Sequence, residues 1–219
     1  MMDKMRDGNS VKNTETQRHR GAQARWRAAV GSVSLCLCVF NAVITAQTKP
    51  VAERIQQCTV CHGSDGNSRV KNTPSLAGQP EFFLLNQLVL MREGVRPIEP
   101  MKPYVKDLQD SDIEAIAQYF AALEPKPSEE IPDPALMQRG AELAASLRCA
   151  SCHLPDFAGR QQIPRLARQR MDYLIYSMKQ FRDNTRSGAD TLMSNVVAGL
   201  SDADLTALAH YSASIRSEK

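Results

Sequence analysis

Apolar residues recur along residues 47–219 with the spacing of helices. In the segment that begins at Asp112, apolar side chains stand at positions i, i+3 or i+4, and i+7. This is the pattern of an amphipathic helix, for which Asp110 or Ser111 is a suitable N-cap. A related pattern begins at Ser201. No window alternates between apolar and polar residues for long enough to indicate a strand. The chain is therefore expected to be all-α.

The same periodicity predicts four more helices, near residues 51–58, 80–93, 134–149 and 171–182. Together the six helices form two matching sets, because the chain repeats itself with a period near 91 residues. Cys58 matches Cys149 at an offset of 91, and Leu108–Tyr119 matches Leu200–Tyr211 at an offset of 92. Gly140 would let its helix approach the last helix closely, whereas Lys49 stands at the matching place of the first copy.

A proline-rich segment separates the two copies. Residues 124–134 contain four prolines and no apolar periodicity, which is typical of a stiff, extended linker. The sequence thus predicts one domain over residues 47–123, a linker over 124–134 and a second domain over 135–219. Each copy has only about 80 residues, which is marginal for an independent core.

The first 46 residues resemble an export leader. They carry seven Lys or Arg and three Asp or Glu, and an apolar run extends from Ala28 to Ala46. This order of charge, apolar run and small terminal residue predicts a signal peptide over residues 1–46, with an uncleaved membrane anchor as the alternative. Either way, the remainder of the chain is expected in an exported compartment, the periplasm.

Charge and composition narrow the function classes. With 42% hydrophobic and 23% charged residues, the chain has ordinary globular composition. Residues 47–219 carry 20 basic and 21 acidic side chains, which gives no reason to expect a nucleic-acid partner. Residues 47–125 have a net charge of −2 and residues 135–219 of +3. This difference could orient docking on a partner.

Four of the six cysteines form two copies of one motif, C-x-x-C-H. The copies are Cys58-Thr59-Val60-Cys61-His62 and Cys149-Ala150-Ser151-Cys152-His153, whereas Cys36 and Cys38 lie in the leader. C-x-x-C-H is the attachment signature of c-type haem. On a helix the two thiols and the imidazole share one face, so all three can reach one porphyrin. A structural zinc, a thioredoxin-like redox pair or two disulfides would also use C-x-x-C pairs, but none of them explains the repeated histidine.

The iron ligands follow in part from the motif. His62 and His153 are the expected proximal ligands, and a ligating imidazole usually donates its other N–H to a carbonyl. Pro74 and Pro164 each open a Pro-x-Leu-Ala segment 12 and 11 residues later, and their carbonyls are the candidate acceptors. The alternative is that these prolines only punctuate a loop before a helix.

The sixth ligand must come from elsewhere. Of the four histidines, only His210 is spare, and we interpret it as an ordinary helix residue. Met101 and Met193 stand at matching places, each expected in a non-helical stretch before the last helix, and are the candidate axial ligands. Methionine at this position raises the potential of a c-type haem and closes the iron to other ligands. Met91, Met171 and Met178 fall in helical patterns and are expected in the core.

Four arginines also stand at matching places. Arg92 and Arg182 occupy equivalent helix ends, and Arg96 and Arg186 lie just beyond them. They are candidates to pair with haem propionates, because a guanidinium fits a carboxylate well. A solvated charge at a helix C-terminus is the alternative.

The chain resembles class I c-type cytochromes, and its tandem arrangement is similar to the dihaem cytochrome c4 family. The resemblance covers about residues 50–215. Its most specific parts are Cys61-His62-Gly63-x-Asp65-Gly66-Asn67-Ser68, Pro74-Ser75-Leu76-Ala77-Gly78-Gln79 and the stretch from Met101 to Tyr119. The second copy departs from this pattern. Leu154-Pro155-Asp156-Phe157 replaces the Gly-x-Asp-Gly turn, and Arg165 and Arg168 replace serine and glycine.

The resemblance implies two class I cytochrome c domains, each wrapped around one covalently bound haem. It also implies a periplasmic electron carrier between a quinol-oxidising complex and a terminal oxidase, in free or membrane-associated form. No catalytic residue and no small-molecule substrate is expected for such a carrier. Two alternatives remain open: the cytochrome subunit of a dehydrogenase or oxidase, and a dihaem peroxidase. A peroxidase needs one iron whose sixth ligand is absent or displaceable, and the presence of both Met101 and Met193 argues against this.

Overall fold

The computed structural model describes residues 49–188 and 191–216, so the predicted leader lies outside the described residues. Within this part all regular elements are helices, apart from an isolated bridge between Arg160 and Ile163. The all-α prediction is confirmed. Among these helices none combines the length and the apolarity that crossing a membrane requires.

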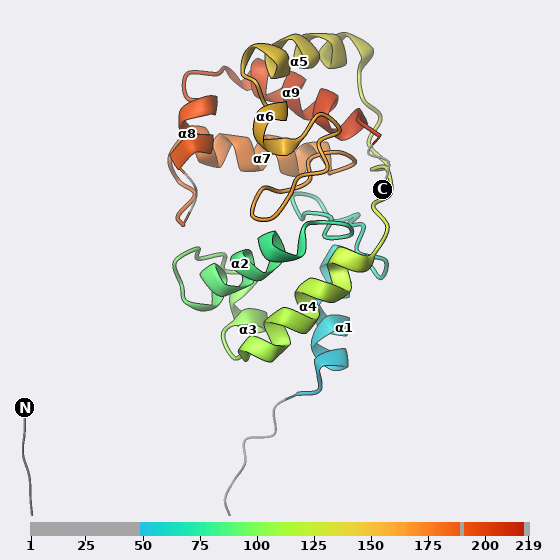
Figure 1. The fold of residues 1–219 in the computed structure, drawn as a ribbon, viewed down its shortest axis with the longest axis vertical. Coiled ribbons are helices and arrows are strands. Elements are labelled where there is room, and N and C mark those ends of the chain that lie inside the picture. Colours follow the sequence, from blue (N-terminus) through green and yellow to red (C-terminus); the bar gives the residue numbers. More distant parts are fainter. Residues whose placement is uncertain (1–48, 189–190, 217–219) are drawn as a thin grey trace, which may run out of the picture. The chain divides into compact units, whose positions relative to one another are not determined.

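The helices fall into two sets that the linker joins (Figure 1). The first half, residues 49–122, contains α1 (Val51–His62), α2 (Glu81–Arg92), α3 (Lys102–Val105) and α4 (Asp110–Ala122). The second half, residues 134–216, contains α5 (Pro134–Ser146), α6 (Ala150–His153), α7 (Met171–Arg182), α8 (Thr191–Val197) and α9 (Asp202–Ser214). Between Ala122 and Pro134 the chain forms no helix. The domain boundaries given above remain a prediction.

The middle and last helices follow the sequence closely. Helices α2 and α7 occupy the expected ranges to within a residue. Ser201 is the N-cap of α9, and its hydroxyl accepts a hydrogen bond from the Asp204 N–H at 3.2 Å. The N-cap expected for α4 was wrong. Gln109 takes that position, because its own N–H donates to the Asp112 carboxylate at 2.9 Å and fixes the start of the helix one residue earlier.

The first helix of each set differs from the prediction. Helix α1 does not end at Cys58 but continues through the whole C-x-x-C-H motif to His62. In the second half, α5 ends at Ser146, and a separate short helix, α6, carries the motif. Arg148 lies between them with φ of +55°, a left-handed conformation that ends a right-handed helix.

The stretches that carry Met101 and Met193 are more helical than expected. Met193 lies inside α8, and Met101 is the N-cap of α3. Both helices are shorter than eight residues and have no long apolar period, so the sequence pattern gave no signal for them.

Each half has its own apolar core. In the first half the buried side chains come mainly from α2 and α4, and they include Leu84, Leu88, Ile113, Ile116 and Phe120. In the second half there are two smaller clusters, one around Phe157 and Leu208 and one around Met171 and Leu174. The first half therefore has one continuous core, where the second half has two separate clusters. Each fully buried aliphatic or aromatic side chain stabilises the fold by about 1.5–3 kcal/mol relative to an exposed one.

Helices α5 and α9 cross at very short distance, as Gly140 predicted. A Cβ atom added at Gly140 would lie 2.1 Å from the Ala207 carbonyl oxygen and 2.6 Å from the Tyr211 Cβ. Only glycine fits at this crossing. Lys49, its counterpart in the first half, instead precedes α1 and forms an exposed ion pair with Glu53.

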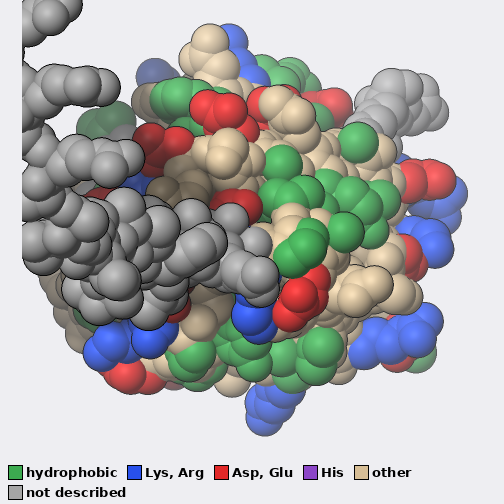
Figure 2. Space-filling model, turned by 90° about the horizontal axis from the view of Figure 1, so that it is seen from below, with side chains coloured by type: hydrophobic (Ala, Val, Ile, Leu, Met, Phe, Trp, Pro, Cys, Tyr) green, Lys and Arg blue, Asp and Glu red, His purple; other side chains and the backbone are tan. Residues whose placement is uncertain are grey.

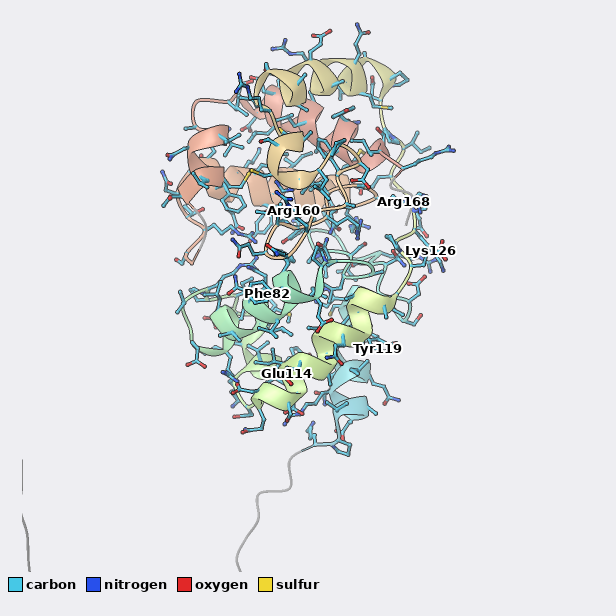
Figure 3. All side chains as sticks on the ribbon, viewed as in Figure 1. Phe82, Glu114, Tyr119, Lys126, Arg160 and Arg168 are labelled. Atoms are coloured by element: carbon cyan, nitrogen blue, oxygen red, sulfur yellow. The ribbon has the colours of Figure 1, made fainter. Side chains whose placement is uncertain are left out.

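The linker is held along its length by side-chain hydrogen bonds. At the start of the linker, the Lys126 N–H donates to Asn67 Oδ1 at 2.8 Å. Arg168 of the second half donates to the Pro125 carbonyl at 2.8 Å, and Figure 3 shows Arg168 near Lys126 of the linker. Further on, the Glu130 carboxylate accepts from the first two N–H groups of α7 at 2.7 and 3.0 Å. A carboxylate at a helix N-terminus is favourable for the helix. These contacts tie the linker to both halves.

Candidate functional site

The two C-x-x-C-H motifs lie in equivalent local structures. In each, the first cysteine is partly buried, the second is exposed and the histidine is buried. Helical backbone through Cys58–His62 puts the two thiols and the imidazole on one face, as the spacing predicted. The second motif has the same arrangement on α6, with Cys149 as the residue before the helix.

His62 is oriented by a backbone carbonyl. Its Nδ1 lies 2.9 Å from the Pro74 carbonyl oxygen. Because a carbonyl can only accept, Nδ1 carries the proton and Nε2 carries the lone pair. Nε2 is buried and has no hydrogen-bond partner in the described part of the chain. Burial lowers the pKa of His62, so the imidazole is neutral and able to bind a metal.

His153 has the same orientation in the second half. Its Nδ1 donates to the Pro164 carbonyl at 2.9 Å, and burial lowers its pKa as well. Phe157 packs beside this imidazole with ring centroids 6.4 Å apart, and Tyr211 meets Phe157 edge-on at 5.7 Å. The proline carbonyls therefore accept from the histidines, as expected for imidazoles that are held ready for a metal.

These residues fit a covalently attached haem. Each pair of free thiols stands beside a fixed imidazole, and in the first half the ring nitrogen that would bind iron is buried and without a partner. A zinc site of four thiolates does not fit, because no group of three or more His, Cys, Asp or Glu in the described residues converges on a point. A thioredoxin-like pair does not fit either. Burial raises the pKa of Cys58 to about 11, whereas a reactive thiol needs a low pKa.

The candidate axial methionines are both partly buried. Met101 packs against the core of the first half, as does Cys58. Met193 lies on α8, which packs against α7. Their role as iron ligands remains a prediction. Met178 packs in the core of the second half, and His210 Nδ1 accepts from the Asp133 N–H at 2.9 Å. His210 thus anchors the start of α5.

Arg92 and Arg182 form two matching clamps. Arg92 donates to the Asp110 carboxylate at 2.7 Å and to the Leu108 carbonyl at 3.2 Å. Arg182 donates to the Asp202 carboxylate and the Leu200 carbonyl at the same two distances. Each clamp joins the end of a middle helix to the start of the last helix. Both arginines pair with carboxylates and are about one-fifth exposed, so neither is the solvated helix-end charge of the alternative. Their role toward propionates remains a prediction.

Arg96 and Arg186 meet from opposite halves. Burial alone would raise the pKa of the Tyr173 hydroxyl, but the neighbouring Arg186 and Arg96 guanidiniums lower it below its usual value. Burial, followed by the neighbouring Arg186, lowers the pKa of Arg96. Their further contacts are neutral: Arg96 donates to Gln87 at 2.6 Å and Arg186 to Ser177 at 3.0 Å. Among the described residues no carboxylate lies within ion-pair distance of either guanidinium. This cluster can therefore accept anionic groups.

Two glutamines for which the sequence predicted no role also join the halves. Gln79 and Gln169 are buried, and each amide forms two hydrogen bonds with the backbone of the opposite half. Tyr173 was missed as well. A signal was present in each case: Gln follows Leu-Ala-x in both copies, and Tyr173 carries a hydroxyl where the first copy has Phe83.

The surface shows no single dominant charge at the end of the first half. Figure 2 shows Lys and Arg side chains interspersed with Asp and Glu around apolar side chains on this face. Val60, within the first motif, and Val70 are exposed, and both line a pocket with Cys61, Gly63 and Asn67.

Comparisons with known proteins agree with this geometry. The family model described as cytochrome c oxidase, cbb3-type, subunit III matches twice, over residues 46–120 and 135–211. Cytochrome c4 from Pseudomonas aeruginosa is 35% identical over 165 residues, which cover 70% of this chain and 81% of that protein. The chain belongs to the dihaem cytochrome c4 family. The resemblance found from the motifs is thereby confirmed.

Two further similarities extend this result. The crystal structure of reduced cytochrome c4 from Pseudomonas stutzeri has a TM-score of 0.69 and 31% identity, covering 77% of this chain and all of that one. A thiosulfate dehydrogenase electron acceptor from Thiomonas intermedia is 32% identical over 170 residues, covering 70% of this chain and 76% of that protein. As a cytochrome c4 family member, the protein is an electron-transfer cytochrome with two covalently bound c-type haems and redox proteins as partners.

Proposed function

We propose that this protein is an exported, periplasmic carrier that passes electrons between a quinol-oxidising complex and a terminal oxidase. The observation that supports this most is the duplicated histidine arrangement, in which a proline carbonyl fixes each imidazole behind a pair of thiols. Cys58, Cys61, Cys149 and Cys152 would attach the haems, and His62 and His153 would bind the irons. The apolar run in residues 28–46 supports export.

In this proposal, Met101 and Met193 complete the iron coordination. Held by a histidine and a methionine, a c-type haem would supply one-electron chemistry at a raised potential. The protein residues then act by fixing the imidazoles and by excluding water from the buried histidine faces. Such an arrangement suits electron transfer and gives no access to a substrate, so we infer no enzymatic activity of its own.

The carboxylates of the haems are the natural partners of the Arg96, Tyr173 and Arg186 cluster. Two guanidiniums that are partly buried and lack an acidic partner in the described residues favour anionic neighbours. We infer that this pair, rather than Arg92 and Arg182, interacts with propionates. Replacing Arg96 or Arg186 by Gln should lower the haem potentials, because a positive charge near a haem favours the reduced state; a redox titration measures this.

The experiment that tests the function is a redox titration of the purified holoprotein with optical spectra and carbon monoxide binding. Two reversible haems that bind carbon monoxide poorly are expected. Met101→Ala should open only the first haem to carbon monoxide and Met193→Ala only the second, each with a fall in that potential. Rapid carbon monoxide binding by half the haem in the unaltered protein would favour a peroxidase. Unchanged behaviour of both variants would refute the axial assignment.

A second candidate function is that of electron acceptor for a thiosulfate-oxidising dehydrogenase. The similarity to the Thiomonas intermedia protein favours it. The two functions are separated by measuring reduction of the oxidised holoprotein, once by a quinol-oxidising complex and once by a purified thiosulfate dehydrogenase with thiosulfate. Faster reduction by the dehydrogenase at equal concentrations would favour the second function.

A further inference from the structure

A pair of glutamines links the two halves through a symmetric set of hydrogen bonds. Gln79 and Gln169 occupy matching positions of the repeat and are only 3% and 2% exposed. Gln169 Oε1 accepts from the Ser75 N–H at 2.8 Å, and its Nε2 donates to the Ser75 carbonyl at 2.9 Å. Gln79 Oε1 accepts from the Arg165 N–H at 2.9 Å, and its Nε2 donates to the Arg165 carbonyl at 3.0 Å.

Each glutamine binds a peptide group that also holds a proximal histidine. The Ser75 N–H and the Pro74 carbonyl belong to one peptide unit, and that carbonyl accepts from His62 Nδ1 at 2.9 Å. The chain of hydrogen bonds therefore runs from His62 through the peptide to Gln169, in the other half. In the same way, His153 is connected through the Pro164–Arg165 peptide to Gln79.

Hydrogen bonds in such a chain strengthen one another. When the amide N–H donates to an oxygen, the carbonyl of the same peptide becomes more polarised and a better acceptor. A better acceptor draws the Nδ1 proton of the imidazole and makes Nε2 a more basic ligand. Both groups are buried, so water does not compete with either bond. The strength of each imidazole as a ligand thus depends on an amide in the opposite half.

We propose that Gln169 is a positioning residue for His62, and Gln79 for His153, so that each half tunes the haem of the other. This inference rests on the proposed function only in that the two histidines bind the irons. A more basic imidazole favours the oxidised iron, so each glutamine lowers the potential of the haem across the interface. A change in how the halves pack would therefore alter both potentials.

The test uses the full holoprotein with Gln169→Met or Gln79→Met, in which a side chain of similar length has no amide. Asp172→Ala is the matched control, because Asp172 accepts from the Asn72 N–H across the same interface but touches neither histidine peptide. The readouts are the two haem potentials and the Nδ1–H proton shift of each histidine in the reduced, 15N-histidine-labelled protein. This shift moves upfield when the hydrogen bond weakens.

The expected result is a crossed pattern. Gln169→Met should move the His62 Nδ1–H signal upfield and raise the potential of the first haem, with His153 and the second haem unchanged. Gln79→Met should do the reverse, and Asp172→Ala neither. If a Met variant does not retain both haems, Asn at the same position keeps an amide one methylene short of its partner and should weaken the same bond.

Three outcomes would overturn the proposal: changes in the glutamine's own half, equal changes in both halves, or the same changes in Asp172→Ala. Each would mean that the glutamines only hold the halves together. Failure of the proposed function would look different, because the unaltered protein would then lack two haem potentials and two histidine Nδ1–H signals.

Discussion

At four matched places of the repeat, the first half has a glycine and the second half has a residue with a side chain, and the backbone has positive φ in both. In the first half these four glycines have φ between +64° and +89°, and Asn72 is a further described residue of that half with positive φ. The counterparts of the four glycines in the second half have positive φ between +51° and +70°, and none is glycine. The pairs are Gly63 and Leu154, Gly66 and Phe157, Gly78 and Arg168, and Gly94 and Asn184. A side chain in this region costs about 1–2 kcal/mol, so other contacts must offset it.

Gly66 and Phe157 show what those contacts are. The Gly66 carbonyl accepts from the N–H groups of Leu76 and Ala77, and the Phe157 carbonyl accepts from the two matching N–H groups. These bonds hold the segment whose proline binds the histidine. At Gly66 an added Cβ would lie 2.9 Å from Leu123 Cδ1. Phe157 instead has room for its ring, which is 3% exposed and packs between His153 and Tyr211.

The halves also differ in how the motif helix is supported. In the first half one continuous helix, α1, carries the motif. In the second half the helix is broken, and the close crossing of α5 over α9 at Gly140 supplies the support. The lesson is that one local geometry around a histidine can be reached either through a flexible backbone or through tertiary packing that overrides backbone preference.

The largest effect is expected for Gly140→Ala. Its Cβ would overlap the Ala207 carbonyl, a backbone atom that cannot move aside without shifting α9. The free energy of unfolding should fall by about 3 kcal/mol, the upper end of the usual cost of overpacking. Lys49→Ala, at the matching place of the first half, should change it by less than about 0.5 kcal/mol. Denaturant unfolding followed by circular dichroism measures both, and equal effects would contradict the difference in helix packing.

Phe157→Gly should have the next largest effect. Loss of the buried ring costs about 3–5 kcal/mol, and relief of the positive φ returns about 1–2 kcal/mol. The net loss of unfolding free energy should be about 1–4 kcal/mol, centred near about 2.5 kcal/mol and measured in the same way. Gly66→Ala in the first half should destabilise for the opposite reason, because it adds strain and a clash. A stabilising effect of Phe157→Gly would show that backbone strain outweighs packing here.

Arg168→Gly should be nearly neutral. The substitution removes a hydrogen bond to the Pro125 carbonyl, worth about 1.5–3 kcal/mol for a charged donor, and relieves about 1–2 kcal/mol of positive-φ strain. A change within about 1 kcal/mol of zero is expected in calorimetric or denaturant unfolding. Arg168→Ala, which loses the bond but keeps the strain, should be clearly less stable than Arg168→Gly. The reverse order would mean that the Arg168 backbone is unstrained.

The smallest effect concerns the two arginine clamps, which are alike in both halves. Arg182 lowers the pKa of Asp183, and Lys179 followed by Arg182 lowers that of Asp202. Because these pKa values are lower in the folded state, the stabilisation is present above the unfolded values and is lost as the pH falls through the folded ones.

Arg182→Gln should therefore destabilise slightly at neutral pH, and its difference from the unaltered protein should vanish in acid. Unfolding curves over a pH series measure this. Arg92→Gln should have a similarly small effect at neutral pH, since its contacts have the same distances. A loss in Arg182→Gln that persists unchanged in acid would mean that packing, not charge, carries the clamp.

The helical class, the duplication and the two haem motifs could all be predicted from the amino-acid sequence. These features depend on local spacing: three to four residues per helical turn, and two thiols and an imidazole within one turn. The carbonyls of Pro74 and Pro164 could also be named in advance, because each proline opens the same Pro-x-Leu-Ala segment at nearly the same distance after its histidine. The close approach of two helices at Gly140 could be predicted as well, since a lone glycine in a helix indicates that another backbone packs against it.

How the two halves meet could not be predicted, because it depends on contacts between residues far apart in the chain. Arg165 stands where the first copy has Ser75, and it is only 2% exposed. Its guanidinium donates to the Ala77 carbonyl of the first half at 2.8 Å. The Arg96, Tyr173 and Arg186 cluster and the glutamine links bring together residues about 77–94 positions apart in the sequence. Contacts over such distances leave no periodic signal along the chain, because they depend on how two complete cores pack against each other.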